Sequence, residues 1–284
     1  MASHLKVALL TTLTMLAFAG NSLLCRAALA GTGIDAASFT AIRLASGALC
    51  LAALAHMLRP SASGGGSWPS ALALFGYAAF FSFAYLSLTA ATGALLLFGA
   101  VQATMIAYGL WNGERFMPLQ LAGLALAVGG VVFLLLPGLA APPLLGALLM
   151  LAAGVAWGCY SLRGHRGGDP LRVTVGNFLL SVPMAVLMLL LMHEELSVDA
   201  AGVGYAIASG AIASGVGYAI WYTVLPSLRS TTAATVQLSV PAIAAAGGAL
   251  LLGEPITLRL LFASAAILGG IWMVIRIGKA GHAK

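Results

Sequence analysis

Three amide side chains lie deep inside long apolar stretches of this sequence, where polar groups are rare. They are Asn21, Gln102 and Gln237. An amide in such surroundings can hold a small molecule by hydrogen bonds, or it can bond to a neighbouring helix, an interaction worth about 0.6 kcal/mol in a membrane. Both interpretations stay open for each residue. The chemistry that these side chains offer is non-covalent binding.

Aromatic side chains accompany the three amides and could supply an apolar surface for a ligand. Trp157 and Tyr160 are three residues apart, so a helix would place both rings on one face. Trp157 also lies between Gly154 and Gly158, and small residues at this spacing let helices approach closely beside the indole. We predict that Trp157 lines a cavity, with core packing as the alternative. The full set of aromatic candidates is Tyr85, Phe98, Trp157, Tyr160, Tyr218, Trp221 and Tyr222.

Charged side chains inside the apolar stretches are few. A charge at the centre of a membrane helix costs about 2.5–3.5 kcal/mol, so any such group is a functional candidate. Arg43 is the deepest; it can either extend to the membrane surface or face a cavity and hold a carboxylate. Arg26 is within reach of the surface. Glu114 and Glu254 each follow a glycine at a helix end, and we expect each to cap the helix that comes after it.

Patterns of catalytic or metal-binding residues are absent from the sequence. His193 and Glu194 could begin a His-Glu-x-x-His zinc motif, but Ser197 stands where the second histidine should be. There is no Gly-x-Ser-x-Gly elbow and no phosphate-binding P-loop, and the three cysteines lie far apart. We therefore expect no enzyme activity, no cofactor and no metal.

The elements that position these residues are expected to be membrane helices. Hydrophobic residues make up 61% of the 284 and charged residues 7%, whereas a soluble domain carries roughly 25% charge. Continuous apolar runs favour an all-α protein over a strand barrel, and the first run is longer than the apolar core of a usual signal peptide. A span needs about 20 apolar residues, and ten such stretches occur: 5–28, 36–58, 70–91, 93–112, 118–136, 143–162, 171–192, 201–225, 231–252 and 257–277.

The second half of the sequence repeats the first. With a constant shift of 140 positions, Gly129-Gly130 aligns with Gly269-Gly270, and a Gly-Glu pair recurs. Because each half holds an odd number of spans, the two copies must cross the bilayer in opposite directions, an arrangement typical of secondary transporters. We predict two five-helix domains, residues 1–140 and 141–284, related as inverted repeats.

Basic residues predict the orientation. With the N-terminus inside, ten of the thirteen lysines and arginines fall on the inner side, which places both termini in the cytoplasm of a bacterial-type inner membrane. The net charge of +6 is thus spread over short loops and indicates no nucleic-acid partner. The inner residues are Lys6, Arg59, Arg115, Arg163, Arg166, Arg172, Arg229, Arg276, Lys279 and Lys284, and the outer ones are Arg26, Arg43 and Arg259.

Proline and glycine predict where a helix could bend. Pro241 lies in the middle of the ninth span, where it removes a backbone hydrogen bond and should kink the helix. Gly247 and Gly248 follow it in a narrow stretch that another helix could approach closely. The matching position in the first half is Val101, so the two halves differ here. We expect these three residues to form a hinge.

Several segments together resemble a known family. Trp157-Gly158, the run from Gly217 to Tyr222 and the run from Leu252 to Pro255 are similar to the EamA family of the drug/metabolite transporter superfamily. The resemblance covers nearly the whole chain, and the first half is the weaker copy. Within the superfamily the chain most resembles the YddG-type amino acid exporters. This resemblance implies export of amino acids, particularly those with large apolar or aromatic side chains.

Together these features predict a ten-helix carrier that exports small metabolites by alternating access through a central cavity. The bilayer and a small-molecule substrate are its expected partners, and ten spans can enclose a cavity in a monomer. Export of a drug or another metabolite is an alternative within transport; a channel, a sensor or a receptor is an alternative outside it. Because no carboxylate is expected at mid-membrane, an uncoupled or weakly coupled exporter fits better than a proton-driven exporter of cations.

Overall fold

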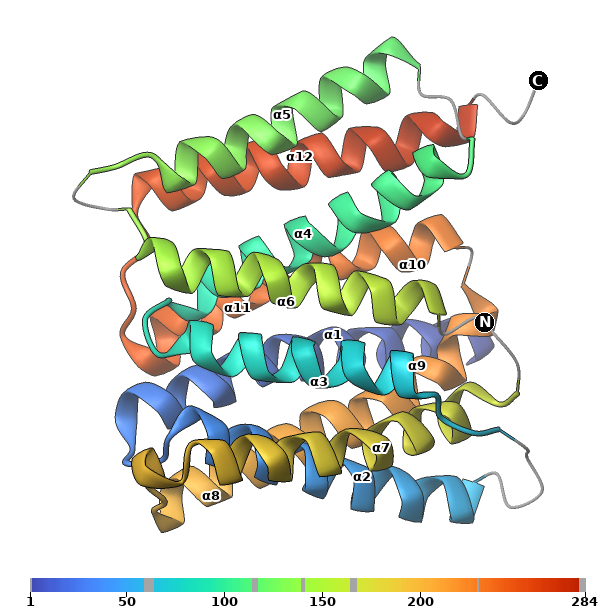
Figure 1. The fold of residues 1–284 in the computed structure, drawn as a ribbon. Helices are drawn as coiled ribbons and strands as arrows, with labels where there is room; N and C mark the ends of the chain where they lie inside the picture. The colour runs from blue at the N-terminus through green and yellow to red at the C-terminus, as the bar shows by residue number, and fades with distance from the viewer. Residues whose placement is uncertain are drawn as a thin grey trace.

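The computed structural model describes residues 2–58, 64–113, 117–138, 141–163, 168–228 and 230–280, and within these ranges it contains helices and no strand (Figure 1). The helices are α1 (Ala2–Gly31), α2 (Ala36–Leu58), α3 (Trp68–Tyr85), α4 (Ala90–Trp111), α5 (Pro118–Leu135), α6 (Leu144–Arg163), α7 (Pro170–Leu191), η1 (His193–Glu195), α8 (Ala200–Ile207), η2 (Ala208–Val216), α9 (Gly217–Val224), η3 (Leu225–Ser227), α10 (Ser230–Gln237), α11 (Ser239–Leu252) and α12 (Leu258–Ala280).

Nine helical segments of the described residues are long and apolar enough to cross a membrane. The predicted third span, 70–91, is not among them. Its helix α3 ends at Tyr85, because Thr89 begins the next helix by accepting a hydrogen bond from the Thr92 backbone N–H at 3.3 Å. More than half of the residues of α3 are buried. A helix that faces protein can carry tyrosine and serine side chains, which lowers its hydropathy below that of a helix that faces lipid.

Three pairs of corresponding helices of the two halves pack against each other: α2 with α7, α4 with α11 and α5 with α12. α5 lies beside α12 at one edge of the bundle and α2 beside α7, while α3 packs on α6 and α1 packs on α8, η2 and α9 (Figure 1). The repeated glycines explain the closest of these contacts. A Cβ atom on Gly130 would lie 2.8 Å from Ile267 Cγ1, and one on Gly270 would collide with the carbonyl oxygen of Gly123. Small residues therefore bring α5 and α12 together, as in other membrane helix pairs.

Two of the predicted spans are irregular. The eighth, expected at 201–225, is α8, η2 and α9 in series, and the nine residues of η2 are wound as a π-helix. The ninth is divided into α10 and α11 at Leu238. Pro241 is the third residue of α11, in the first turn, where a backbone N–H has no partner within the helix and proline is tolerated. The break therefore precedes the proline, and α11 starts afresh around it.

Candidate functional site

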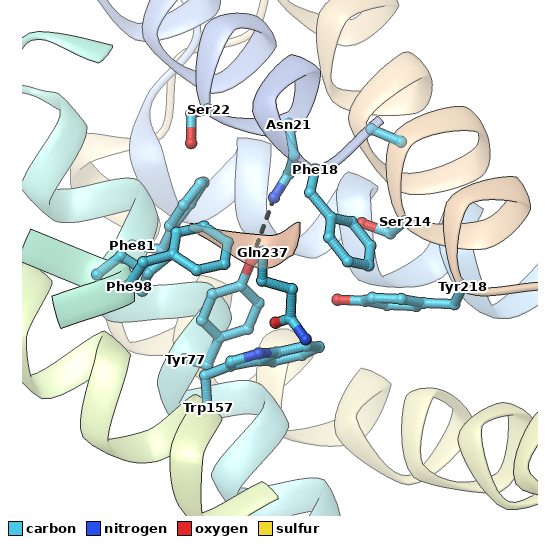
Figure 2. A pocket seen from close by; sticks show the side chains of 12 residues that line it. Phe18, Asn21, Ser22, Tyr77, Phe81, Phe98, Trp157, Ser214, Tyr218 and Gln237 are labelled. Atoms are coloured by element: carbon cyan, nitrogen blue, oxygen red, sulfur yellow. Dashed lines mark hydrogen bonds between the residues drawn. The ribbon is translucent and has the colours of Figure 1, made fainter. Parts of the chain in front are cut away.

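A cavity lies where helices from both halves meet, and Figure 2 shows its lining. α1, α3 and α4 contribute from the first half, and α6, η2, α9 and α10 from the second. The lining is aromatic and amide-rich, with no acidic side chain among the described residues. Its members are Phe18, Asn21, Ser22, Tyr77, Phe81, Leu97, Phe98, Trp157, Ala213, Ser214, Tyr218 and Gln237.

Trp157 is the centre of an aromatic wall in this cavity. Its ring stacks on that of Tyr218, with centroids 5.5 Å apart and planes at 18°, and lies 4.7 Å from that of Tyr77. The Tyr160 ring also packs on the indole, with a centroid distance of 5.2 Å. Rings in such arrangements attract one another beyond the area that they bury. The wall therefore joins α3 of the first half to α6 and α9 of the second (Figure 2).

The glycines on either side of Trp157 place its helix. A Cβ atom on Gly154 would lie 2.6 Å from the carbonyl oxygen of Leu97, and one on Gly158 would lie 2.7 Å from Thr104 Cβ. Both contacts are with α4, so α6 approaches that helix as closely as the backbones allow. The predicted close approach beside the indole is present, and it directs Trp157 toward Tyr77 and Tyr218.

A chain of hydrogen bonds runs behind the wall through α1, α2, α3 and η2. The Asn21 amide donates to the Tyr77 hydroxyl at 3.1 Å (dashed line in Figure 2), and its oxygen accepts from the Ser209 hydroxyl at 2.6 Å. Arg43 Nη2 donates to the same Tyr77 hydroxyl at 2.9 Å. Asn21 thus bonds to neighbouring helices and lines the cavity as well. The interhelical hydrogen bond predicted as one of its two roles is thus present, and binding of a small molecule stays a prediction.

Arg43 is buried at 2% exposure and does not extend to the protein surface. Its guanidinium lies over the rings of Tyr77 and Phe81, with the central carbon 5.1 and 4.8 Å from their centroids. Cation–π contacts of this kind partly replace the hydration that a buried cation loses. Arg43 is not itself a lining residue, but both rings beneath it are.

The eleven residues predicted to bind substrate divide into two groups. Asn21, Phe98, Trp157, Tyr218 and Gln237 line the cavity. The other six are not lining residues. Arg43 and Tyr160 contact the lining as described, and Gln102 is buried one helical turn after Phe98. Tyr85 is edge-on to Phe81 at 4.8 Å, Trp221 is edge-on to Phe18 at 6.0 Å, and Tyr222 is hydrogen-bonded with Thr174 at 3.2 Å.

Sequence reasoning missed seven lining residues: Phe18, Ser22, Tyr77, Phe81, Leu97, Ala213 and Ser214. Tyr77 shows why. A third span at 70–91 has its centre near residue 80 and favours Tyr85 as much as Tyr77. The helix actually ends at Tyr85, so that tyrosine lies at its end and bonds to the carbonyl oxygen of Ala90 at 3.3 Å. Locating the Thr89 cap from the sequence would have moved the centre toward Tyr77.

The predicted hinge residues all belong to α11, which packs against α1. A Cβ atom on Gly247 would lie within 3.1 Å of a Leu23 methyl group, so α11 approaches α1 closely there. The carbonyl oxygen of Gly248 accepts from the Glu254 backbone N–H at 3.0 Å, which closes the end of α11. Pro241 begins this helix, as described above.

An ion pair connects the halves at the end of α11. Glu254 Oε1 lies 3.0 Å from Arg26 Nε, and Oε2 accepts from the Ala90 backbone N–H at 2.8 Å. Arg26 also donates to the carbonyl oxygen of Tyr85 at 3.0 Å. One prediction is thereby corrected: Glu254 caps α4 instead of α12, because the chain folds back on the N-terminus of α4 at this point. Its partner Arg26 keeps 21% of its side chain exposed. Glu114 lies outside the described residues, as do Arg59, Arg115, Arg166, Arg229 and Lys284.

Comparisons with known proteins found a transporter family and several relatives. The sequence pattern of the EamA-like transporter family matches residues 144–276. An uncharacterized protein of Pseudomonas aeruginosa is 59% identical over 96% of both chains. Two proteins of Escherichia coli K12 match in part: a probable amino-acid metabolite efflux pump, 29% identical over 57% of this chain and 59% of that protein, and the threonine/homoserine exporter RhtA, 30% identical over 63% and 62%.

A solved crystal structure has the same fold. It superposes with a TM-score of 0.66 at 19% sequence identity, and the match covers 96% of this chain and 98% of the other. The likeness extends over both halves of the bundle, including the first half, which the family pattern does not reach.

Proposed function

The chain belongs to the EamA-like transporter family, and from this premise we propose that it exports amino acids with large apolar or aromatic side chains through the cavity between its halves. It is a multi-pass membrane protein that transports small metabolites, a class to which its named relatives belong. The finer assignment of substrate depends on the cavity. An inner-membrane location follows from the same premise.

The observation that carries the substrate proposal is the aromatic wall of Tyr77, Trp157 and Tyr218. Stacked rings offer a flat apolar surface for an aromatic or large aliphatic side chain. The wall is built from both halves, so a relative movement of the halves changes its shape. A site at the interface of two repeats is where secondary transporters bind their substrates.

Alternating access is proposed to arise from two inverted five-helix repeats of ten spans in all, residues 1–140 and 141–284, with both termini in the cytoplasm. Two features support the repeat. The corresponding helices α2 and α7, α4 and α11, and α5 and α12 pack in pairs. Gly113 and Gly253, 140 positions apart, both take the positive φ that favours glycine at helix ends. Cysteine labelling of residues 114 and 254 in intact cells tests the orientation. Accessibility from the same face of the membrane would contradict inversion.

Counterflow of labelled phenylalanine into proteoliposomes tests the transport proposal. A carrier shows saturation and trans-stimulation, a channel shows neither, and a sensor moves no substrate. Truncating Trp157 to alanine should raise the half-saturating phenylalanine concentration about tenfold, because one aromatic contact is worth up to about 1.5 kcal/mol. Trp111→Ala is the matched control, since that indole is 91% exposed at the end of α4.

Threonine should be measured in the same assay, because one relative is named an exporter of threonine and homoserine. A threonine preference over phenylalanine, with Trp157→Ala unchanged from wild type, would contradict the proposed side-chain specificity and leave amino acid export in place. Transport of neither would favour a drug or another metabolite as substrate.

A further inference from the structure

Two side-chain atoms of the described residues are buried and have no hydrogen-bond partner: Arg43 Nη1 and Ser214 Oγ. Buried polar groups are nearly always paired, and a cation without a partner is costlier than a neutral group. Both atoms belong to the surroundings of one cavity. Ser214 lines it, and Arg43 contacts the lining residues Tyr77 and Phe81.

Ser214 and Arg43 belong to elements that touch. η2 packs against α2 so closely that a Cβ atom on Gly210 would collide with the Arg43 carbonyl oxygen. η2 is also a π-helix, a distortion found frequently at functional sites. The π-helix thus packs on the backbone of Arg43 and carries the unpaired hydroxyl of Ser214.

The Tyr77 hydroxyl adds a third donor. It accepts from Asn21 Nδ2 and from Arg43 Nη2, which occupies both of its lone pairs. Its proton is therefore left to donate, and no acceptor for it occurs among the described residues. Tyr77 lines the cavity (Figure 2). A hydroxyl that accepts from a guanidinium is polarised and becomes a better donor.

No carboxylate of the described residues balances Arg43. Asp35, Asp169 and Asp199 accept backbone hydrogen bonds at the N-termini of α2, α7 and α8, and Glu254 pairs with Arg26. The cavity lining itself holds no acidic side chain. A buried guanidinium with donors on one side and no anion is a site that an anionic group completes, because charge-assisted hydrogen bonds are the strongest that proteins make.

We propose that Arg43, Tyr77 and Ser214 form a subsite for the carboxylate of the substrate, while the wall around Trp157 receives its side chain. This inference rests on the proposed function and deepens it. Because the described lining offers no anion for an ammonium group, the subsite recognises a monocarboxylate whether or not it carries an amine. The carboxylate is the required group of the substrate, and the amine is dispensable.

Three probes that share a phenyl ring test the subsite: phenylalanine, 3-phenylpropionate and phenethylamine, each titrated calorimetrically into the purified full-length protein. We expect the two carboxylates to bind and phenethylamine to bind at least tenfold more weakly. Arg43→Gln should weaken both carboxylates at least tenfold and should not weaken phenethylamine, since only the carboxylates lose a charge-assisted bond.

Ser214→Ala removes a hydroxyl that has no hydrogen-bond partner among the described residues, so it folds even where Arg43→Gln does not. Tyr77→Phe keeps the ring and removes the acceptor of Asn21 and Arg43. Each should weaken both carboxylates about fivefold, the worth of one ordinary hydrogen bond. Thr12→Ala, on the exposed face of α1, is the control. Phenethylamine binding as tightly as 3-phenylpropionate, or an equal loss of all three probes in the variants, would overturn the subsite.

The counterflow assay separates this outcome from failure of the proposed function. Saturable phenylalanine counterflow with no carboxylate preference leaves the function and removes the subsite. Binding of 3-phenylpropionate that depends on Arg43, without phenylalanine counterflow, keeps the subsite and removes amino acid export. Binding of none of the three probes overturns both.

Discussion

The two halves of the bundle wind equivalent helices differently. α4 runs unbroken from Ala90 to Trp111, whereas its counterpart is divided into α10 and α11; α3 is regular, whereas the segment 140 positions later contains η2. These two interruptions of the described residues belong to the second half, and both reach the cavity, through Ser214 and Gln237. The two halves thus meet at the cavity with different backbones, regular in α3 and α4 and interrupted in η2 and at Leu238.

One glycine in each half shows how differently α3 and η2 are packed. Gly76 in α3 has space around it, because the nearest atom to an added Cβ would be 3.8 Å away in the flexible Phe80 side chain. Gly210 in η2 has none, since an added Cβ would collide with the backbone of α2. The π-helix is therefore fitted to α2, and it is not a loose segment.

Val101→Pro is the change expected to have the largest effect. Val101 is buried in the middle of α4 and matches Pro241 of the interrupted helix. A proline in a continuous helix removes a hydrogen bond and clashes with the preceding turn, at a cost of about 3 kcal/mol or more. Thermal unfolding in detergent should show that loss. Val101→Ala, which leaves the backbone intact, is the control, and a wild-type melting temperature for Val101→Pro would show that α4 does not need continuity.

Gly210→Ala should have the next largest effect. It should lower the free energy of unfolding, whereas the comparable change in the first half, Gly76→Ala, should raise it. Overpacking against α2 should cost about 1–3 kcal/mol of unfolding free energy. Gly76→Ala should instead stabilise α3 by up to about 1 kcal/mol, because alanine is the better helix former. The same melting assay measures both. If both substitutions raise the melting temperature, the fit of η2 to α2 is wrong.

Glu254→Gln tests how much the helices α1 and α4 of the first half are stabilised by a side chain of the second half. The glutamate is 11% exposed and supplies both the partner of Arg26 and the acceptor for Ala90 at the start of α4. Loss of its charge should cost about 1–2 kcal/mol, because bonds to charged groups are worth about 1.5–3 kcal/mol and glutamine keeps part of them. Arg26→Gln should give a similar loss, and the double variant should lose less than the sum. Glu194→Gln, at an 87% exposed side chain, is the control.

The positions of the helices could be predicted from the sequence because an apolar stretch of membrane length is a local property. The predicted and observed bounds of α2 are the same, and most others differ by one or two residues. The winding of η2 could not be predicted, since serine, glycine and alanine also occur in regular membrane helices. It depends on the fit of Gly210 to α2, which is a contact between distant segments.

The sequence could predict those residues of the candidate site that are recognised by their depth within a span. Trp157 follows from a glycine spacing that is visible in the sequence, and it lies in the cavity. The partner of Glu254 and the direction of Arg43 depend on which helices are neighbours, and that information is not local. The hydrogen-bond chain through Asn21 likewise joins segments that are 56 and 188 residues apart.

Pro241→Ala should have the smallest effect on stability, under about 1 kcal/mol, because Pro241 lies in the first turn of α11 where its missing N–H is not needed. The alanine restores a donor that can join α10 to α11 as one helix like α4. If the break allows the second half to move, counterflow should slow several-fold although the protein melts normally. Pro183→Ala is the control: that proline is inside α7 and exposed, so its removal should raise the melting temperature and leave counterflow unchanged. Wild-type counterflow in Pro241→Ala would place the moving part in η2 instead of at Leu238.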